Sequence, residues 1–101
     1  MQISKDNTDI RNSLRAFHSR IDTMHQDMYK YYNGLEKKLP DLEGLEKELL
    51  LYSKKKIFDT VLSKNLDRIL YKFQNRKRIW LTWIEEYHHS LKKEEKEEKK
   101  D

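Results

Sequence analysis

The chain of 101 residues contains no cysteine, and this absence excludes several kinds of chemistry at once. Disulfide bonds, thiolate metal sites and cysteine nucleophiles are ruled out, and an intracellular location is favoured. No apolar run approaches the roughly 20 residues that a membrane-spanning helix needs. Residues 1–6 lack the apolar segment of a secretory signal. We therefore expect an intracellular protein without a transmembrane segment, in a compartment that the sequence does not specify.

Glycine and proline are also scarce, with two glycines and one proline in the whole chain. Charged residues make up 40% and hydrophobic residues 36%, a composition that favours long solvated helices over sheets. So few glycines leave little material for a phosphate-binding or active-site loop. The expected fold class is all-α: an antiparallel helical hairpin or a three-helix bundle with coiled-coil character and one long C-terminal helix.

Apolar side chains recur at alternating spacings of four and three residues in the first third of the chain. The eight residues of this helix-packing seam are Ile10, Leu14, Phe17, Ile21, Met24, Met28, Tyr31 and Leu35. Such a heptad pattern places one narrow apolar stripe on a helix. A single helix cannot bury its own stripe, so the pattern predicts a helix that packs against other helices.

Capping and breaking residues predict where the helices begin and end. Residues 1–8 are expected to be frayed, and Asp9 favours the start of a helix over 9–33. Gly34 is a stop signal and Pro40 suits a helix start, which leaves a connection over 34–40. Residues 41–91 form either one long helix or two helices broken near 53–65, where the apolar stripe changes phase. Residues 92–101 are expected to form a charged, solvated tail.

A second apolar stripe runs through the C-terminal half and carries both tryptophans. A single helix over this half would be roughly 80 Å long and the first helix only roughly 40 Å. Much of the longer helix is then expected to lack a partner within the chain. Core packing and an interface role are both open for the tryptophans, because Trp and Tyr often anchor protein interfaces. The predicted partner interface consists of Phe73, Trp80, Trp83, Ile84 and Tyr87.

The positive charge of the chain is concentrated in residues 54–78. This stretch holds nine basic and two acidic residues, whereas the whole chain has a net charge of only +4. The candidate anion contacts are Lys54, Lys55, Lys56, Arg76, Lys77 and Arg78. Basic residues beside aromatic ones favour nucleic acid, but an acidic protein or an anionic lipid surface explains the same charge. No known nucleic-acid-binding signature is present.

Two residue pairs, Asp22 with His25 and Glu85 with His88, have a spacing found among metal ligands in helical bundles. Both pairs lie off the apolar stripes, and the additional core glutamates of such sites are missing. Solvated polar faces are the better interpretation. We expect no metal, no cofactor and no catalytic residue.

The sequence thus favours a non-enzymatic small helical subunit, a structural or interaction component of a larger protein assembly. That assembly would be either heteromeric or a homo-oligomeric bundle. The alternative is a nucleic-acid-binding accessory protein that uses the basic stretch 54–78.

Overall fold

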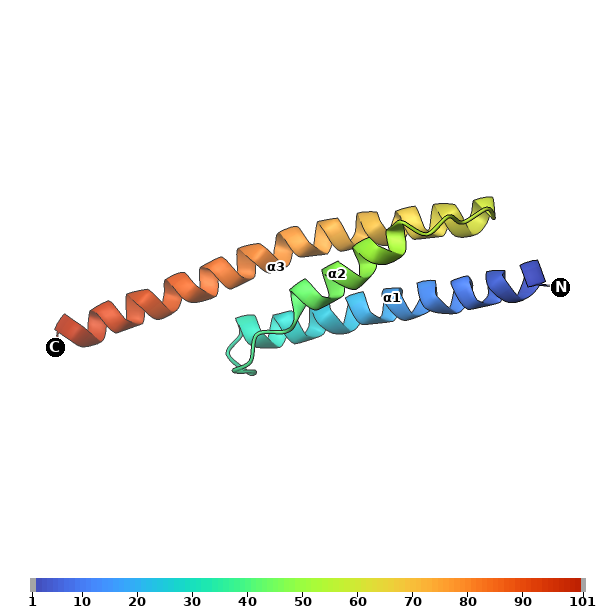
Figure 1. The fold of residues 1–101 in the computed structure, drawn as a ribbon. Coiled ribbons are helices and arrows are strands. Elements are labelled where there is room, and N and C mark those ends of the chain that lie inside the picture. Colours follow the sequence, from blue (N-terminus) through green and yellow to red (C-terminus); the bar gives the residue numbers. More distant parts are fainter. Residues whose placement is uncertain (1, 101) are drawn as a thin grey trace.

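A computed structural model describes the backbone of residues 2–100 and the side chains of residues 7–91. These residues form three α-helices and no strand: α1 (Gln2–Tyr32), α2 (Leu42–Ser53) and α3 (Thr60–Lys100). The fold is an all-α three-helix bundle, elongated to 72 × 18 × 16 Å (Figure 1). None of the described helices is long and apolar enough to cross a membrane.

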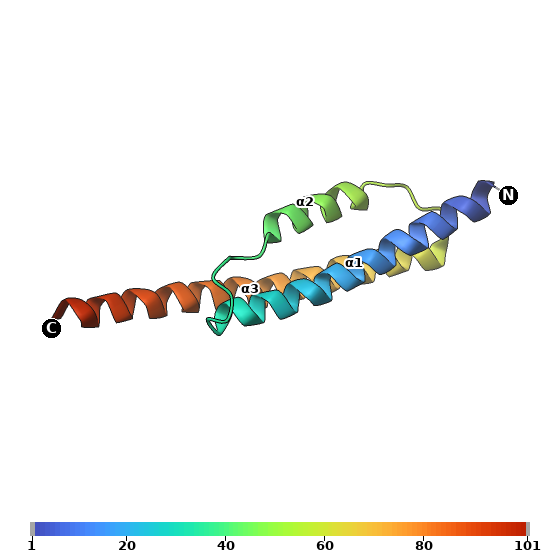
Figure 2. The same ribbon diagram turned by 90° about the horizontal axis from the view of Figure 1, so that it is seen from below.

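α1 and α3 run in the same direction. α2, which connects them in the sequence, runs in the opposite direction. Asp22 pairs with Lys72, and Tyr31 packs on Tyr87 further along both helices. α2 runs the opposite way: Tyr52, in its last turn, packs on Phe17 in the first half of α1. Figures 1 and 2 show α2 on one side of the α1–α3 pair, while α3 projects well past the C-terminal end of α1.

α1 ends at a Schellman motif built on Gly34. The Leu35 N–H donates to the Lys30 carbonyl at 2.8 Å, and the Gly34 N–H donates to the Tyr31 carbonyl at 3.1 Å. Gly34 has a φ of 75°, a left-handed conformation that glycine adopts at little cost. At its other end α1 begins at Gln2 rather than at residue 9. No glycine or proline precedes Gly34 to stop the helix from extending that far.

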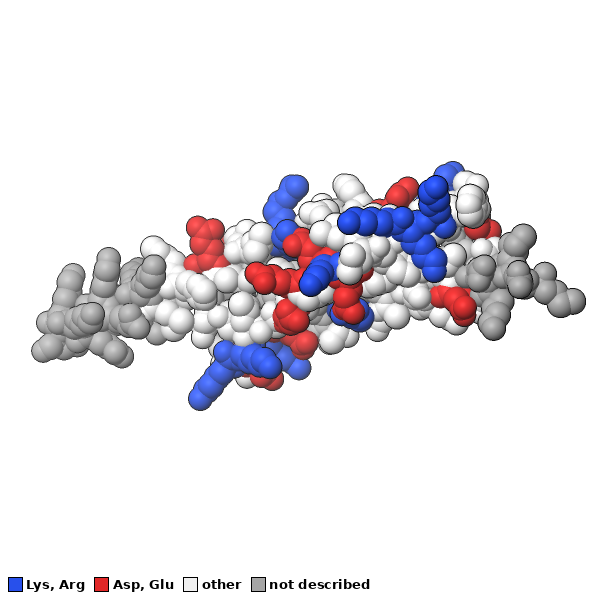
Figure 3. Space-filling model, in the orientation of Figure 1, with Lys and Arg blue, Asp and Glu red and all other residues white. Residues whose placement is uncertain are grey.

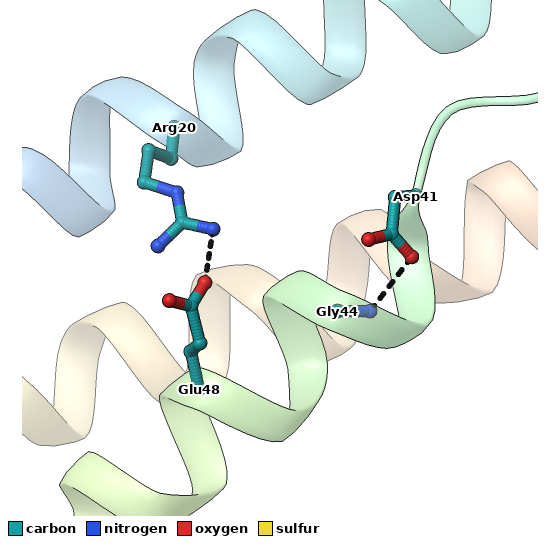
Figure 4. Close-up of polar contacts among 4 residues, drawn as sticks. All are labelled: Arg20, Asp41, Gly44 and Glu48. Carbon is teal, nitrogen blue, oxygen red and sulfur yellow. Dashed lines mark hydrogen bonds and ion pairs between the residues drawn. The ribbon is translucent and has the colours of Figure 1, made fainter.

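α2 begins with a side-chain cap on its first turn. The Asp41 carboxylate accepts the Gly44 N–H at 3.0 Å (Figure 4), which satisfies one of the free N–H groups of a helix start. A Cβ atom at residue 44 would lie 2.2 Å from a carboxylate oxygen of Asp41, so a larger residue there would require the capping side chain to move. In the same view an ion pair between Arg20 and Glu48 links α1 to α2.

The second connection spans residues 54–59, so residues 41–91 contain two helices rather than one. α3 starts where the Asp59 carboxylate accepts the Leu62 N–H at 3.0 Å. Its backbone remains helical to Lys100, through most of the segment expected as a charged tail. The side chains of 92–101 lie outside the described residues.

The core is one continuous cluster to which all three helices contribute. The buried residues are Ile10, Leu14, Phe17, Ile21, Met28 and Tyr31 of α1, Leu45 and Leu49 of α2, and Leu62, Leu66, Ile69, Phe73 and Trp80 of α3. Six of the eight predicted seam residues are therefore buried. Met24 is partly buried and packs against the same cluster.

Leu35 departs from the predicted seam. It lies beyond the end of α1 and is 72% exposed. The chain turns away from the helix axis at Gly34, one residue before Leu35. The side chain of Leu35 therefore does not lie on the face of α1 that the heptad spacing predicts. A heptad count continued past a helix stop signal has no structural meaning.

Candidate functional site

The residues predicted to form a partner interface divide into a buried and a half-buried set. Trp80 is 0% exposed and Phe73 is buried beside it, with their rings packed edge to face at 6.0 Å. Neither side chain is accessible to another molecule. The prediction is wrong for these two residues because α1 lies parallel to α3 and covers α3 as far as Tyr87.

Trp80 is held by a polar contact as well as by packing. Its Nε1–H donates to Nδ1 of His25 on α1 at 3.0 Å. Nδ1 therefore carries no proton, and the neutral imidazole holds its proton on Nε2. Burial lowers the pKa of His25 below its ordinary value, and the charge of Arg76 lowers this pKa further, against a smaller opposing effect of Asp22.

Trp83 and Tyr87 are partly buried against the end of α1. The Trp83 ring is stacked on Tyr32 at 5.4 Å and lies 5.2 Å from the His25 ring. The Tyr87 ring lies 4.7 Å from Tyr31. These contacts join α1 to α3 and leave both rings only partly accessible to a partner.

Ile84 is the predicted interface residue with the best access to a groove. The groove lies between α3 and the segment that leads into α2. Its apolar lining consists of Leu39, Pro40, Leu42, Leu81 and Ile84, and its polar lining of Asp41, Glu43, Glu46 and Lys77. The sequence prediction missed this groove because Leu39 and Leu81 belong to neither apolar stripe. The sequence feature that could have revealed the groove is the presence of large apolar residues at positions out of phase with the two stripes.

The six predicted anion contacts do not form one surface. Lys54, Lys55 and Lys56 are exposed in the connection between α2 and α3, and Figure 3 shows Lys and Arg side chains gathered over that connection. Arg78 is exposed on α3, whereas Arg76 is partly buried. Lys77 pairs with Glu46 of α2 at 2.5 Å.

A second ion pair uses a basic residue that the prediction did not single out. Lys72 of α3 contacts Asp22 of α1 at 2.8 Å, and its hydrogen bond lowers the pKa of Asp22 below the ordinary value. Part of the positive charge of the 54–78 stretch is therefore used to join helices.

Potential metal ligands are engaged in helix contacts. The Tyr31 hydroxyl and His88 Nε2 lie 3.3 Å apart, and the Tyr32 hydroxyl donates to Glu86 at 2.7 Å. Among the described residues there is no group of three or more His, Cys, Asp or Glu that could hold a metal ion.

Comparison with known proteins gives no relative: no protein-family model matches the chain, and neither a curated protein nor a solved structure is significantly similar to it. The candidate site therefore rests on the geometry of this chain, in which the α2–α3 groove is an apolar surface open to a partner.

Proposed function

We propose that the chain is a non-enzymatic helical subunit of a larger protein assembly and that it packs against another protein chain through the α2–α3 groove. The observation that carries this proposal is the row of apolar side chains left uncovered where α3 extends past the start of α2. Leu81 is 48% exposed in this row, and Leu39 faces it from the connection that precedes α2.

The lengths of the helices explain why this surface is open. α2 has 12 residues and α3 has 41, which correspond to about 18 Å and about 62 Å. α2 covers its side of α3 up to the Glu46–Lys77 pair, and Leu42 packs against the core at the first turn of α2. Beyond this point nothing in the described chain continues the third helix of the bundle. A helix from another chain would complete it.

The polar rim of the groove indicates the chemistry of such a helix. Asp41 and Glu43 lie at one side, and Glu85 adjoins Leu81 and Ile84 at the other. Glu46 is already paired with Lys77. An amphipathic helix with an apolar stripe and flanking Lys or Arg side chains fits this surface.

Two further features support a role in helical assembly. The buried residues of α1 and α3 both follow four- and three-residue spacings, which favours coiled-coil packing of the two parallel helices. The chain also has no cysteine with which a small extracellular domain is usually stabilised, so we infer an intracellular setting.

Site-specific photo-cross-linking tests the proposal. The photoreactive residue benzoylphenylalanine is placed at position 81, in the groove, and in a matched control at position 82, where Thr82 is exposed on another side of α3. Both chains are irradiated as purified protein and in the cells that make the protein. We expect a discrete cross-linked species from position 81 and none from position 82.

A second substitution makes the result specific to the groove. Ile84→Glu changes a half-buried residue of the groove lining, and we expect it to abolish the species formed from position 81 while the helical circular dichroism is kept. Equal cross-linking from positions 81 and 82, or none from position 81 in either setting, would contradict the proposal.

Nucleic-acid binding is the second candidate function, and one observation favours it. A row of exposed polar side chains on α3, spaced four and three residues apart, consists of Lys64, Arg68, Tyr71, Asn75 and Arg78. The three basic members form no ion pair with another described residue. The row is about 21 Å long and has the charge that phosphates require.

A salt titration of binding to generic duplex DNA and single-stranded RNA tests this candidate. We expect affinity that falls steeply as salt rises. Arg68→Ala and Arg78→Ala should each reduce the salt slope by about one, because each variant neutralises one phosphate fewer. No binding at low salt would eliminate the nucleic-acid function.

A further inference from the structure

The end of the molecule where α2 passes into α3 carries large apolar side chains that the bundle does not use. Phe58 is 93% exposed and Val61 is 75% exposed. Leu50 and Leu51, on the last turns of α2, are exposed as well. Together with Lys54, Lys55 and Lys56, these four residues form what we call the α2–α3 corner. It lies at the opposite end of α2 from the groove.

The local structure explains why these side chains point away from the core. Leu49 and Leu62 are buried and hold the two helix ends in place, and Ile57 packs against the core from the connection between them. The Asp59 cap then fixes the direction in which α3 begins. Phe58 lies between these two fixed points and faces away from the cluster.

The corner is also strongly positive. None of its three lysines forms an ion pair with another described residue; the Lys55 ammonium lies 5.6 Å from the centre of the Tyr52 ring. Asp59 is the one acidic residue within 50–64, and its carboxylate already accepts the Leu62 N–H. The lysines therefore remain available to negative groups of a partner.

Exposed aliphatic and aromatic side chains beside unpaired lysines suit the interface of an anionic bilayer. Apolar side chains enter the boundary between headgroups and acyl chains, and lysines are attracted to anionic headgroups. A nucleic acid would satisfy the lysines and stack on Phe58, but it offers no apolar environment for Val61, Leu50 and Leu51. The combination therefore favours lipid.

We infer that the α2–α3 corner docks peripherally on an anionic lipid bilayer. Phe58 and Val61 enter the interfacial region, Leu51 lies beside them, and the three lysines contact the headgroups. The groove, at the other end of α2, stays free for a protein partner. The inference goes beyond the proposed function and does not depend on it, because the two surfaces share no residue.

Vesicle co-sedimentation of the full chain tests this inference. The vesicles contain either pure phosphatidylcholine or phosphatidylcholine with about 30% phosphatidylserine, in low and high salt. We expect binding to the anionic vesicles that weakens as salt rises. Changing all three corner lysines to glutamine should weaken binding by about 100-fold, and Phe58→Ser by about tenfold.

The other connection of the chain supplies a matched control. Lys37 and Lys38 are adjacent exposed lysines beside the exposed Leu35. Changing both lysines to glutamine, or Leu35→Ser, should alter binding by less than about twofold, because they lie away from the corner. Circular dichroism verifies that every variant keeps its helices.

Because the chain has no cysteine, a single introduced cysteine can be labelled with a dye that reports whether its position enters the bilayer. Phe58→Cys labelled with an environment-sensitive dye should show a blue-shifted emission on anionic vesicles, and Leu35→Cys with the same dye should not. The inference is overturned if binding ignores phosphatidylserine, if the control variants lose as much binding as the corner variants, or if the dye at position 58 stays in water. It is equally overturned if the corner lysines are needed for duplex DNA and not for vesicles.

Discussion

The hydrogen bond from Trp80 to His25 joins the largest fully buried side chain of α3 to a titratable group on α1. The bond requires an unprotonated Nδ1, and burial and Arg76 both disfavour the charged imidazolium, which lowers the pKa of His25. The neutral form of His25 is therefore part of the folded structure. Protonation breaks a contact to the core and places a charge beside Trp83.

Stability should consequently depend on pH through His25. Its pKa in the folded chain lies below the ordinary value of 6.5, so the unfolded chain takes up the proton first as pH falls. The free energy of unfolding should stay level above about pH 7 and decrease from there toward pH 5. The pKa of Asp22 is lowered from 3.8, so the stability that it contributes is lost only at still lower pH.

Urea denaturation at pH 7.5 and pH 5.0 measures this dependence. His25→Gln keeps an acceptor for the indole N–H but does not titrate, and it should lose less stability between the two pH values than the wild type. His89→Gln serves as the control because His89 is exposed. An identical pH dependence in wild type and His25→Gln would refute the assignment.

The cap of α2 leads to a prediction about Gly44. Replacing a helical glycine by alanine usually stabilises by about 1 kcal/mol, but a methyl group at this position meets the Asp41 carboxylate. Gly44→Ala should therefore be neutral or destabilising in the wild type, because loss of the cap costs about 1 kcal/mol. In an Asp41→Ala background the same change should stabilise by about 1 kcal/mol.

Thermal or urea unfolding of the wild type, the two single variants and the double variant measures the coupling energy between Asp41 and Gly44. A coupling energy near zero between Asp41 and Gly44 would mean that the carboxylate does not cap α2.

The Tyr52 hydroxyl is a buried polar atom without a hydrogen-bond partner among the described residues. Its ring packs edge to face on Phe17 at 5.3 Å. Tyr52→Phe removes the hydroxyl and keeps the ring, so it should be neutral or stabilise by up to about 1 kcal/mol. A loss of more than about 1 kcal/mol in urea unfolding would indicate that the hydroxyl has a partner.

These residue-level contacts were largely beyond prediction from the sequence. The stop signal at Gly34 was predictable because the motif is local. The contacts of His25 with Trp80 and of Lys72 with Asp22 were not, since each joins residues about 50 positions apart and depends on which helices are neighbours.

At the scale of the helices, periodicity identified the surface of α1 that packs inward. Spacings of four and three follow from the geometry of one helix and need no knowledge of its neighbours. The same count failed at Leu35, which lies past the Gly34 turn. Counted back four residues from Leu62, the same spacing would include Phe58, whereas α3 begins at Thr60 and leaves Phe58 exposed.

A pair of matching substitutions tests this account of α1. Ile21 is 0% exposed, so Ile21→Asp should destabilise by about 4 kcal/mol or more, enough to unfold a chain of this size. Leu35→Asp makes the same kind of change at an exposed position and should cost less than about 0.5 kcal/mol. Circular dichroism distinguishes them, and equal helix loss in both would refute the assignment of Leu35 to the surface.

At the scale of the whole molecule, the chain presents surfaces of different character at the two ends of α2. The groove combines apolar side chains with acidic neighbours, and the α2–α3 corner combines apolar side chains with lysines. Their partners should therefore differ in charge. The two surfaces share no residue, so under our proposals the chain could contact a protein and a lipid bilayer at the same time.

The arrangement of the helices was the part of the fold that the sequence did not reveal. Periodicity predicted that the helices pair, but not that α1 and α3 lie parallel, because a reversal of the chain erases any register between segments. The parallel arrangement moves Phe73 and Trp80 into the core, and the groove beside α3 stays open.

Hydrogen–deuterium exchange tests the central claim, that another chain packs into the groove beside α3. Exchange is compared between the isolated chain and the chain purified with its bound partners from the cells that make it. We predict that binding slows exchange at 39–43 and 81–91 and leaves 60–72 unchanged. Slowing confined to 60–72, or no slowing at 81–91, would contradict the claim.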